Sequence, residues 1–164
     1  YKGYNNTNQK EILYSEGYTE FVAQLLYYAY LYKTGINKST KHLTYQQLLE
    51  KSLDKSKRTI SYLLNKAQCS TLKDLKDKNT SPKCMWSETT SAYGYFIIRC
   101  SLMMHRNKII NLFLDNNVHG NICFRMNRVE DLRNVIDLCK IDKELDDIKS
   151  SSDEVKKFDL MMSI

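Results

Sequence analysis

The sequence contains few of the residues that interrupt helices. Its 164 residues include 1 Pro and 5 Gly. A sandwich or barrel of many strands needs frequent turns, and turns rely on these two residues. Their scarcity therefore favours helices joined by short polar loops. Because 42% of the residues are hydrophobic, the chain can bury a core, which excludes a wholly disordered polypeptide. The length fits one ordinary domain.

Long apolar runs are also missing from the sequence. No stretch approaches the ~20 apolar residues that a membrane helix needs, and no signal-peptide pattern is present. We therefore expect a soluble chain with no membrane partner. The chain begins at Tyr1 rather than Met, which suggests a piece of a longer polypeptide. The remainder of that polypeptide, or another protein, is the expected partner.

The cysteines show no recognisable pairing pattern. They number five, an odd set without CxxC spacing: Cys69, Cys84, Cys100, Cys123 and Cys139. A closed disulfide framework would leave one of them over, and a zinc-binding knuckle needs closely spaced pairs. We therefore expect reduced thiols and a cytoplasmic or intracellular location, with a virion as the other setting.

Charge and composition suggest three regions. Residues 1–10 form a polar arm, 11–141 form a single helical domain, and 142–164 form an acidic helical tail. The net charge of +6 permits nucleic-acid binding without requiring it. Basic residues are concentrated in 51–58 and 73–83, and a charge run of this kind is also typical of a solvated helix face.

Apolar periodicity and capping residues predict an all-α fold, an irregular or orthogonal bundle of about six to eight helices. Thr44 is the expected N-cap of a second helix, with Gln47 at the capping-box position, and Ser70 the cap of a short one. Gly35 should end the first helix. The expected helices cover 11–33, 45–53, 56–67, 71–76, 88–104, 109–114 and 128–140, with an extended piece near 121–126. The first and the fifth of these should form the central pair.

Residues 43–65, LTYQQLLEKSLDKSKRTISYLLN, have the rhythm of a helix-turn-helix. An amphipathic helix leads to a break at residues 52–55, and a basic helix follows. Lys57, Arg58 and Ser61 at its start offer cations for phosphates and a hydroxyl for base edges. A helical hairpin with a solvated basic face would give the same pattern. Nucleic-acid binding is therefore one hypothesis among three.

The segment Ser15-Glu16-Gly17-Tyr18-Thr19-Glu20-Phe21 opens a long apolar helix. It resembles the segment that supplies the third zinc ligand in gluzincin-type metallopeptidases. The blocks NKAQCSTLKDL (65–75) and ETTSAYGYFIIRCSL (88–102) extend the resemblance to the helical C-terminal part of metallopeptidase-like proteins of large DNA viruses. In such enzymes three protein ligands leave the fourth zinc position open for water.

This resemblance implies roles for a few residues. Glu16 would be the zinc ligand, with Thr19 and Glu20 as supporting or packing residues, and Tyr93 or Tyr95 would stabilise an oxyanion. The sequence contains no HExxH motif, because its three histidines, His42, His105 and His119, stand alone. Zinc would bind only together with a histidine motif outside this chain. By itself the chain is not a complete enzyme, and a Glu at a helix start is favoured by the helix dipole in any case.

A tyrosine cluster supports the alternative function, a non-enzymatic protein-interaction or assembly module of viral character. Tyr27, Tyr28, Tyr30 and Tyr32 point around most of one helix, so some must be buried and others exposed. Tyrosines that stack on bases would be another use of the cluster. A packed helix with a tyrosine-rich contact surface is the interpretation that we favour. It predicts an exposed apolar or tyrosine-rich patch.

Overall fold

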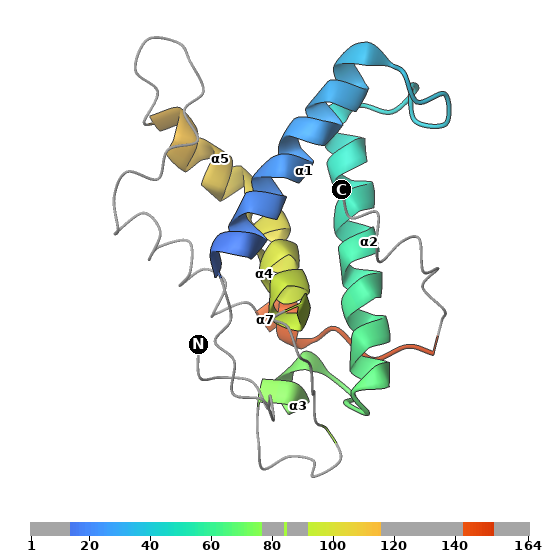
Figure 1. Ribbon diagram of the computed structural model, residues 1–164, viewed down its shortest axis with the longest axis vertical. Helices are drawn as coiled ribbons and strands as arrows, with labels where there is room; N and C mark the ends of the chain where they lie inside the picture. The colour runs from blue at the N-terminus through green and yellow to red at the C-terminus, as the bar shows by residue number, and fades with distance from the viewer. Residues whose placement is uncertain (1–13, 77–83, 85–91, 116–142, 153–164) are drawn as a thin grey trace.

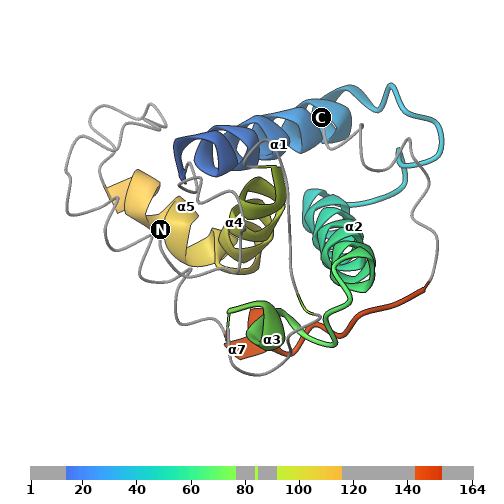
Figure 2. The same ribbon diagram turned by 60° about the horizontal axis from the view of Figure 1, so that its bottom comes forward.

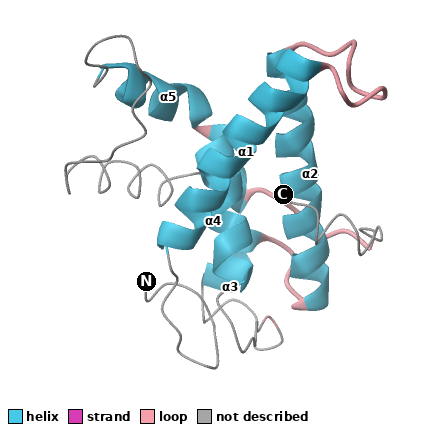
Figure 3. Ribbon diagram, turned by 45° about the horizontal axis from the view of Figure 1, so that its top comes forward, coloured by secondary structure: helices cyan, strands magenta, loops and turns pink. Residues whose placement is uncertain are grey.

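The computed structural model describes residues 14–76, 84, 92–115 and 143–152. All regular secondary structure in these residues is helical, and no strand occurs among them (Figure 3). The helices are α1 (Tyr14–Thr34), α2 (Tyr45–Lys66), α3 (Leu72–Lys76), α4 (Ala92–Met104), α5 (Arg106–Asp115) and α7 (Lys143–Asp146). The predicted all-α class is confirmed for this part of the chain. The extended piece near 121–126 and the helix at 128–140 lie outside the described residues.

Three helices, α1, α2 and α4, form the centre of the molecule (Figure 1). The contact between α1 and α4 is the most extensive, and α4 also packs against α2. The predicted central pair is therefore confirmed. The short helices α3 and α7 lie side by side at one end of this core (Figure 2). No helix among the described residues is long and apolar enough to cross a membrane.

The first helix ends where the sequence predicts. Gly35 adopts a left-handed conformation with φ of 59°, and its amide donates to the carbonyl of Leu31 at 2.9 Å. Only glycine adopts this conformation without a steric penalty, so it terminates helices efficiently. Inside the helix, Phe21, Leu25 and Leu31 are buried in the common core. The local sequence is sufficient to define this element.

The second helix begins as predicted but does not break as predicted. Thr44 accepts a hydrogen bond from the Gln47 amide at 3.2 Å, and the Gln47 side chain accepts one from the Thr44 amide at 2.8 Å. The capping box is therefore confirmed. However, α2 runs continuously from Tyr45 to Lys66, so the expected turn at residues 52–55 is wrong. Without that turn, residues 43–65 do not form a helix-turn-helix.

The continuity of α2 has a physical reason. The polar serines that suggested a break lie on its buried side, Ser52 being 3% exposed and Ser56 2% exposed. The Ser56 hydroxyl donates to the carbonyl of Ser52 at 3.0 Å, one turn earlier. A serine hydroxyl that donates a hydrogen bond to a carbonyl of its own helix can be buried without breaking the helix.

A Schellman motif closes α2. Gln68 has φ of 57°, and the Cys69 amide donates to the carbonyl of Leu64 at 2.9 Å. The next helix, α3, is capped by Thr71 rather than by Ser70 as predicted. The Asp74 amide donates to the Thr71 hydroxyl at 3.3 Å, and the Thr71 amide donates to the Asp74 carboxylate at 2.9 Å. The position of α3 is right, and its cap is one residue later.

The cysteine prediction does not hold for one pair. Cys69 and Cys84 form a disulfide across 15 residues, and both are buried. Cys100 is a buried thiol, whereas Cys123 and Cys139 lie outside the described residues. The pairing was hidden because an odd count and a wide spacing resemble unpaired thiols, although the chain brings Cys84 back to the end of α2.

Candidate functional site

The core contains a close crossing between α1 and α4. A methyl group added at Gly17 would lie 2.6 Å from Ile98 Cγ2 and 2.9 Å from Ile98 Cβ. Those distances are far below van der Waals contact, so α1 approaches α4 as closely as it does because residue 17 has no side chain. The glycine of the EGYTE segment therefore has a packing role.

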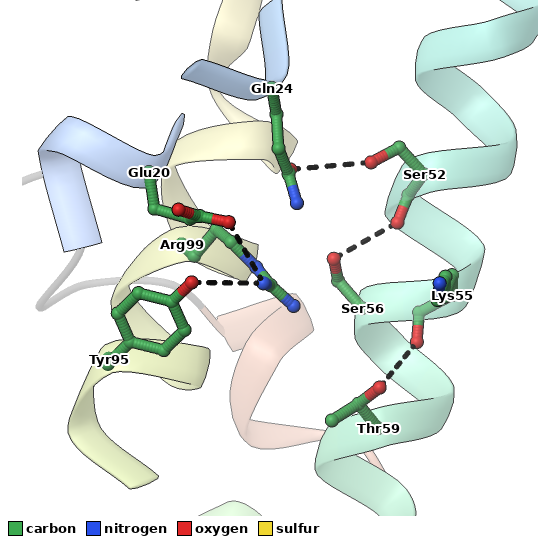
Figure 4. A network of polar contacts seen from close by, with 8 residues as sticks. All are labelled: Glu20, Gln24, Ser52, Lys55, Ser56, Thr59, Tyr95 and Arg99. Atoms are coloured by element: carbon green, nitrogen blue, oxygen red, sulfur yellow. Dashed lines mark hydrogen bonds and ion pairs between the residues drawn. The ribbon is translucent and has the colours of Figure 1, made fainter. Parts of the chain in front are cut away.

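One turn beyond this crossing, a charged cluster is enclosed between the two helices (Figure 4). Arg99 of α4 is only 1% exposed. Its Nη1 lies 3.9 Å from Glu20 Oε1 and donates to Tyr95 Oη at 3.4 Å. Its guanidinium carbon lies 5.3 Å from the centre of the Tyr95 ring and 5.0 Å from that of Phe96. Two aromatic faces and one carboxylate thus enclose the buried cation.

The environment of Tyr95 keeps its hydroxyl neutral. Burial raises the pKa of Tyr95 to about 12, with Arg99 acting to lower it and Glu20 to raise it. Glu20 Oε1 and Arg99 Nε are buried without a hydrogen-bond partner among the described residues. Atoms in that condition carry a desolvation cost, so the cluster holds α1 and α4 in register at the expense of some stability.

Polar side chains extend from this cluster toward α2 (Figure 4). The Ser52 hydroxyl donates to Gln24 Oε1 at 3.4 Å, and both residues are buried. Thr59, also buried, donates to the carbonyl of Lys55 at 3.0 Å. The Ser52–Gln24 bond joins α2 to α1, whereas the Thr59 hydroxyl is satisfied within α2 itself.

The residues assigned by the metallopeptidase resemblance are only partly brought together. Glu16 falls in the first turn of α1 and Tyr93 in the first turn of α4, but their side chains lie outside what the structure describes. Tyr95 and Glu20 do meet, through Arg99. Glu20 thus fits the packing role that the resemblance implied for it.

Within residues 14–76, 84, 92–115 and 143–152, no group of three or more His, Cys, Asp or Glu side chains is placed to hold a metal. His42 is exposed, and His105 sits half-buried at the junction of α4 and α5. His119 lies outside these ranges. A zinc site that uses Glu16 therefore stays a prediction that requires ligands from elsewhere.

The residues of the nucleic-acid hypothesis lie on one side of α2. Arg58 is exposed, while Lys57 and Ser61 are half-buried. Ser61 is also engaged within the protein, because its hydroxyl donates to the carbonyl of Lys149. The three residues belong to a continuous helix and not to a recognition helix after a turn, and only Arg58 of the three is exposed.

The outer face of α1 carries a group of exposed apolar and aromatic side chains. Its members, all exposed, are Ala23, Leu26, Tyr27 and Tyr30. Leu26 is 53% exposed and Tyr30 is 55% exposed. Tyr28, in contrast, packs against the core. Tyr32 is 56% exposed but lies away from this face, with its ring centre 6.4 Å from that of Tyr45. The cluster divides between core and surface, and we call the exposed group on the outer face of α1 the tyrosine face.

Sequence reasoning missed Arg99 as a site residue. It stands in the most apolar segment of the chain, FIIRCSLMM, where a single cation resembles a solvent-facing position. One feature of the sequence could have indicated its burial. A helix that is apolar on nearly every side has no face on which Arg99 could meet solvent, so the cation must be buried with a partner. The identity of that partner, Glu20, could not be read from the sequence.

No protein family, no curated protein and no solved structure matches this chain.

Proposed function

We propose that this chain is a non-enzymatic α-helical assembly module that associates with a second copy through the tyrosine face of α1. The exposed apolar and aromatic side chains of that face carry the proposal. Leu26 and Tyr30 each leave more than half of their surface in water. Tyrosine is enriched at protein contacts because it combines a large apolar ring with a hydroxyl that can still be hydrogen-bonded.

Charge favours a second copy as the occupant. The chain carries a net charge of +6, so two copies that approach through their basic surfaces repel each other. The stretch from Phe21 to Tyr32 contains no charged residue, and its exposed face can therefore meet an identical face without that repulsion. An antiparallel pair of α1 helices about a two-fold axis satisfies this condition, because the same patch serves both partners.

The proposal is tested by sedimentation equilibrium over a range of protein concentrations. The unaltered chain should show a concentration-dependent dimer. Leu26→Lys places two cations near the two-fold axis, so the dimer dissociation constant should rise at least tenfold. Ile36→Lys is the matched control, because Ile36 is also exposed but follows the end of α1. A monomer at every concentration, or an equal loss in both variants, would refute the tyrosine face as the contact.

The metallopeptidase resemblance provides a second proposal, in which the chain is the helical portion of a metallopeptidase-like protein and Glu16 is the third zinc ligand. The location of Glu16 in the first turn of the long helix α1 supports it. The coding sequence upstream of Tyr1 is the direct test. An HExxH motif there, with zinc binding that Glu16→Gln abolishes, supports the proposal. Without that motif in this or an associated polypeptide the proposal fails.

A further inference from the structure

The C-terminal half of α2 presents two basic residues to solvent, Arg58 and Lys66, which are both exposed. They lie on the side of the helix away from Ile60 and Leu64, which are buried in the core. Lys57 is half-buried and, nine residues before Lys66, lies on the opposite side of the helix from it. Together with Lys149, described next, Arg58 and Lys66 form what we call the basic ridge.

A distant part of the chain contributes the third cation. Residues 147–152 follow α7 and run past the C-terminal end of α2 (Figures 1 and 2). The Ser61 hydroxyl donates to the carbonyl of Lys149, and the Ser151 amide donates to the carbonyl of Ser61 at 3.3 Å. The Ser150 amide also donates to the carbonyl of Ser70 at 2.8 Å. These bonds fix the exposed Lys149 beside α2, although 88 residues separate it from Ser61.

Aromatic contact also positions one cation of the ridge. Lys66 Nζ lies 5.3 Å from the centre of the Tyr62 ring, and Tyr62 itself packs against the core. A lysine held over an anchored ring loses part of its rotamer freedom before any ligand arrives. The ammonium group is thus available at a defined place on the surface.

The net charge around the ridge stays positive when the nearby carboxylates are included. Glu50 is paired with Arg106, and the Asp74 carboxylate caps α3. Two exposed carboxylates remain. Asp54 lies one helix turn before Arg58, and Asp147 lies two residues before Lys149. Lys51 and Lys55, earlier on α2, add further positive charge. A polyanion is therefore the complementary ligand.

We propose that the basic ridge binds the phosphate backbone of a nucleic acid without reading its sequence. From residue 58 to residue 66 the ridge extends about 12 Å along the helix, which corresponds to about three to four phosphates of one strand. Contacts to phosphates position a strand, whereas base edges carry the sequence information. The Ser61 hydroxyl, a natural group for contacting a base edge, is already bound to Lys149. The inference does not depend on the assembly proposal.

Fluorescence anisotropy with labelled oligonucleotides tests this inference. The full chain is titrated with a 20-nucleotide single strand of mixed sequence and with the corresponding duplex, each at low and moderate salt. Binding to either form, independent of sequence and weakened by salt with a log–log slope of about −3, is the expected result. Comparison of the two titrations shows whether the chain binds the single strand or the duplex more tightly.

Matched variants separate the ridge from general charge. Arg58→Ala with Lys66→Ala should weaken binding at least tenfold, and Lys149→Ala alone should weaken it severalfold. Lys33→Ala with Lys41→Ala removes the same charge from exposed positions near the end of α1 and should change binding less than twofold. Thermal melting followed by circular dichroism confirms that each variant is folded.

Three outcomes would overturn the inference. Equal weakening in both double variants would show that net charge alone attracts the strand. No binding at low salt would eliminate the ligand class. Ridge-dependent binding to vesicles that contain phosphatidylserine, with no ridge-dependent binding to the oligonucleotides, would assign the ridge to an anionic membrane surface instead.

Discussion

Gly17 shows how a single missing side chain determines the core. The nearest atoms to an added Cβ are Cγ2 and Cβ of Ile98, and neither is the flexible tip of a long side chain. A side chain at residue 17 would therefore fit only if α1 and α4 moved apart, and the Glu20–Arg99 pair lies in the contact between these two helices. Interiors are packed too densely to absorb such a shift without loss.

We predict that Gly17→Ala destabilises the protein by about 1–3 kcal/mol. In an exposed helix the same change would stabilise by up to ~1 kcal/mol, so the sign distinguishes packing from helix propensity. Urea unfolding followed by circular dichroism measures the effect. Combining Gly17→Ala with Ile98→Ala removes the closer clashing atom, so the double variant should lose less than the sum of the two single changes. A gain in stability from Gly17→Ala would contradict the close crossing.

At this scale, the sequence predicts features that depend on neighbours a few residues away. Thr44 and Gln47 are three residues apart, and Gly35 acts on the helix turn that it ends. Arg99 depends instead on Glu20, 79 positions earlier in the chain, and on the rings of its own helix turn. No local pattern indicates which distant carboxylate will meet a buried cation.

Among the elements, α2 illustrates why helix boundaries are difficult to predict from sequence. The run SLDKSKR contains serines and charges that resemble a break. It contains neither Gly nor Pro, so nothing in it forces the backbone to leave the helix. Asp54 and Arg58 are exposed and the two lysines are half-buried, while the serines face inward, where they bond to Gln24 and to the helix itself. The end of α2 is enforced instead by the conformation of Gln68.

The Schellman motif provides a prediction for this element. Gln68 occupies a left-handed conformation with φ of 57°, which costs a residue with a Cβ about 1 kcal/mol or more. Gln68→Gly should therefore raise the free energy of unfolding by about 1 kcal/mol. Gln46→Gly, inside the first turn of the same helix, is the control and should lower the free energy of unfolding, because it places a glycine in the helix and removes the hydrogen bond from Gln46 to Glu50. A loss of stability from Gln68→Gly would show that the Gln68 side chain matters more than its backbone conformation.

For the whole molecule, the apolar density of the sequence was sufficient to identify α1 and α4 as the central pair. It did not identify the disulfide, because the pairing of Cys69 with Cys84 depends on the path of the chain after α3. Two buried thiols in different segments look the same in sequence whether or not they meet. The tyrosine face was predicted as a class of surface, but its members could be assigned only once the buried side of α1 was known.

The disulfide should make the stability of the protein dependent on its redox state. Closing a 15-residue loop is worth about 3 kcal/mol in the chain-entropy description. Reduction with dithiothreitol should therefore lower the melting temperature by several degrees. The variant with Cys69→Ala and Cys84→Ala should melt at a lower temperature that no longer responds to dithiothreitol. An unaltered chain whose melting temperature ignores the reductant would mean that the pair is not bonded.

Leu145 has a consequence for the synthesis of the chain. It is completely buried in the same core cluster as Leu75 of α3, yet the ribosome adds it 70 residues later. At typical elongation rates this interval is about 4 to 14 seconds. During that time the apolar surface at the end of α2 and α3 has no covering segment from α7. Nascent copies in a polysome would expose that surface to one another, so the α7 end of the core is where we expect a chaperone to bind during translation.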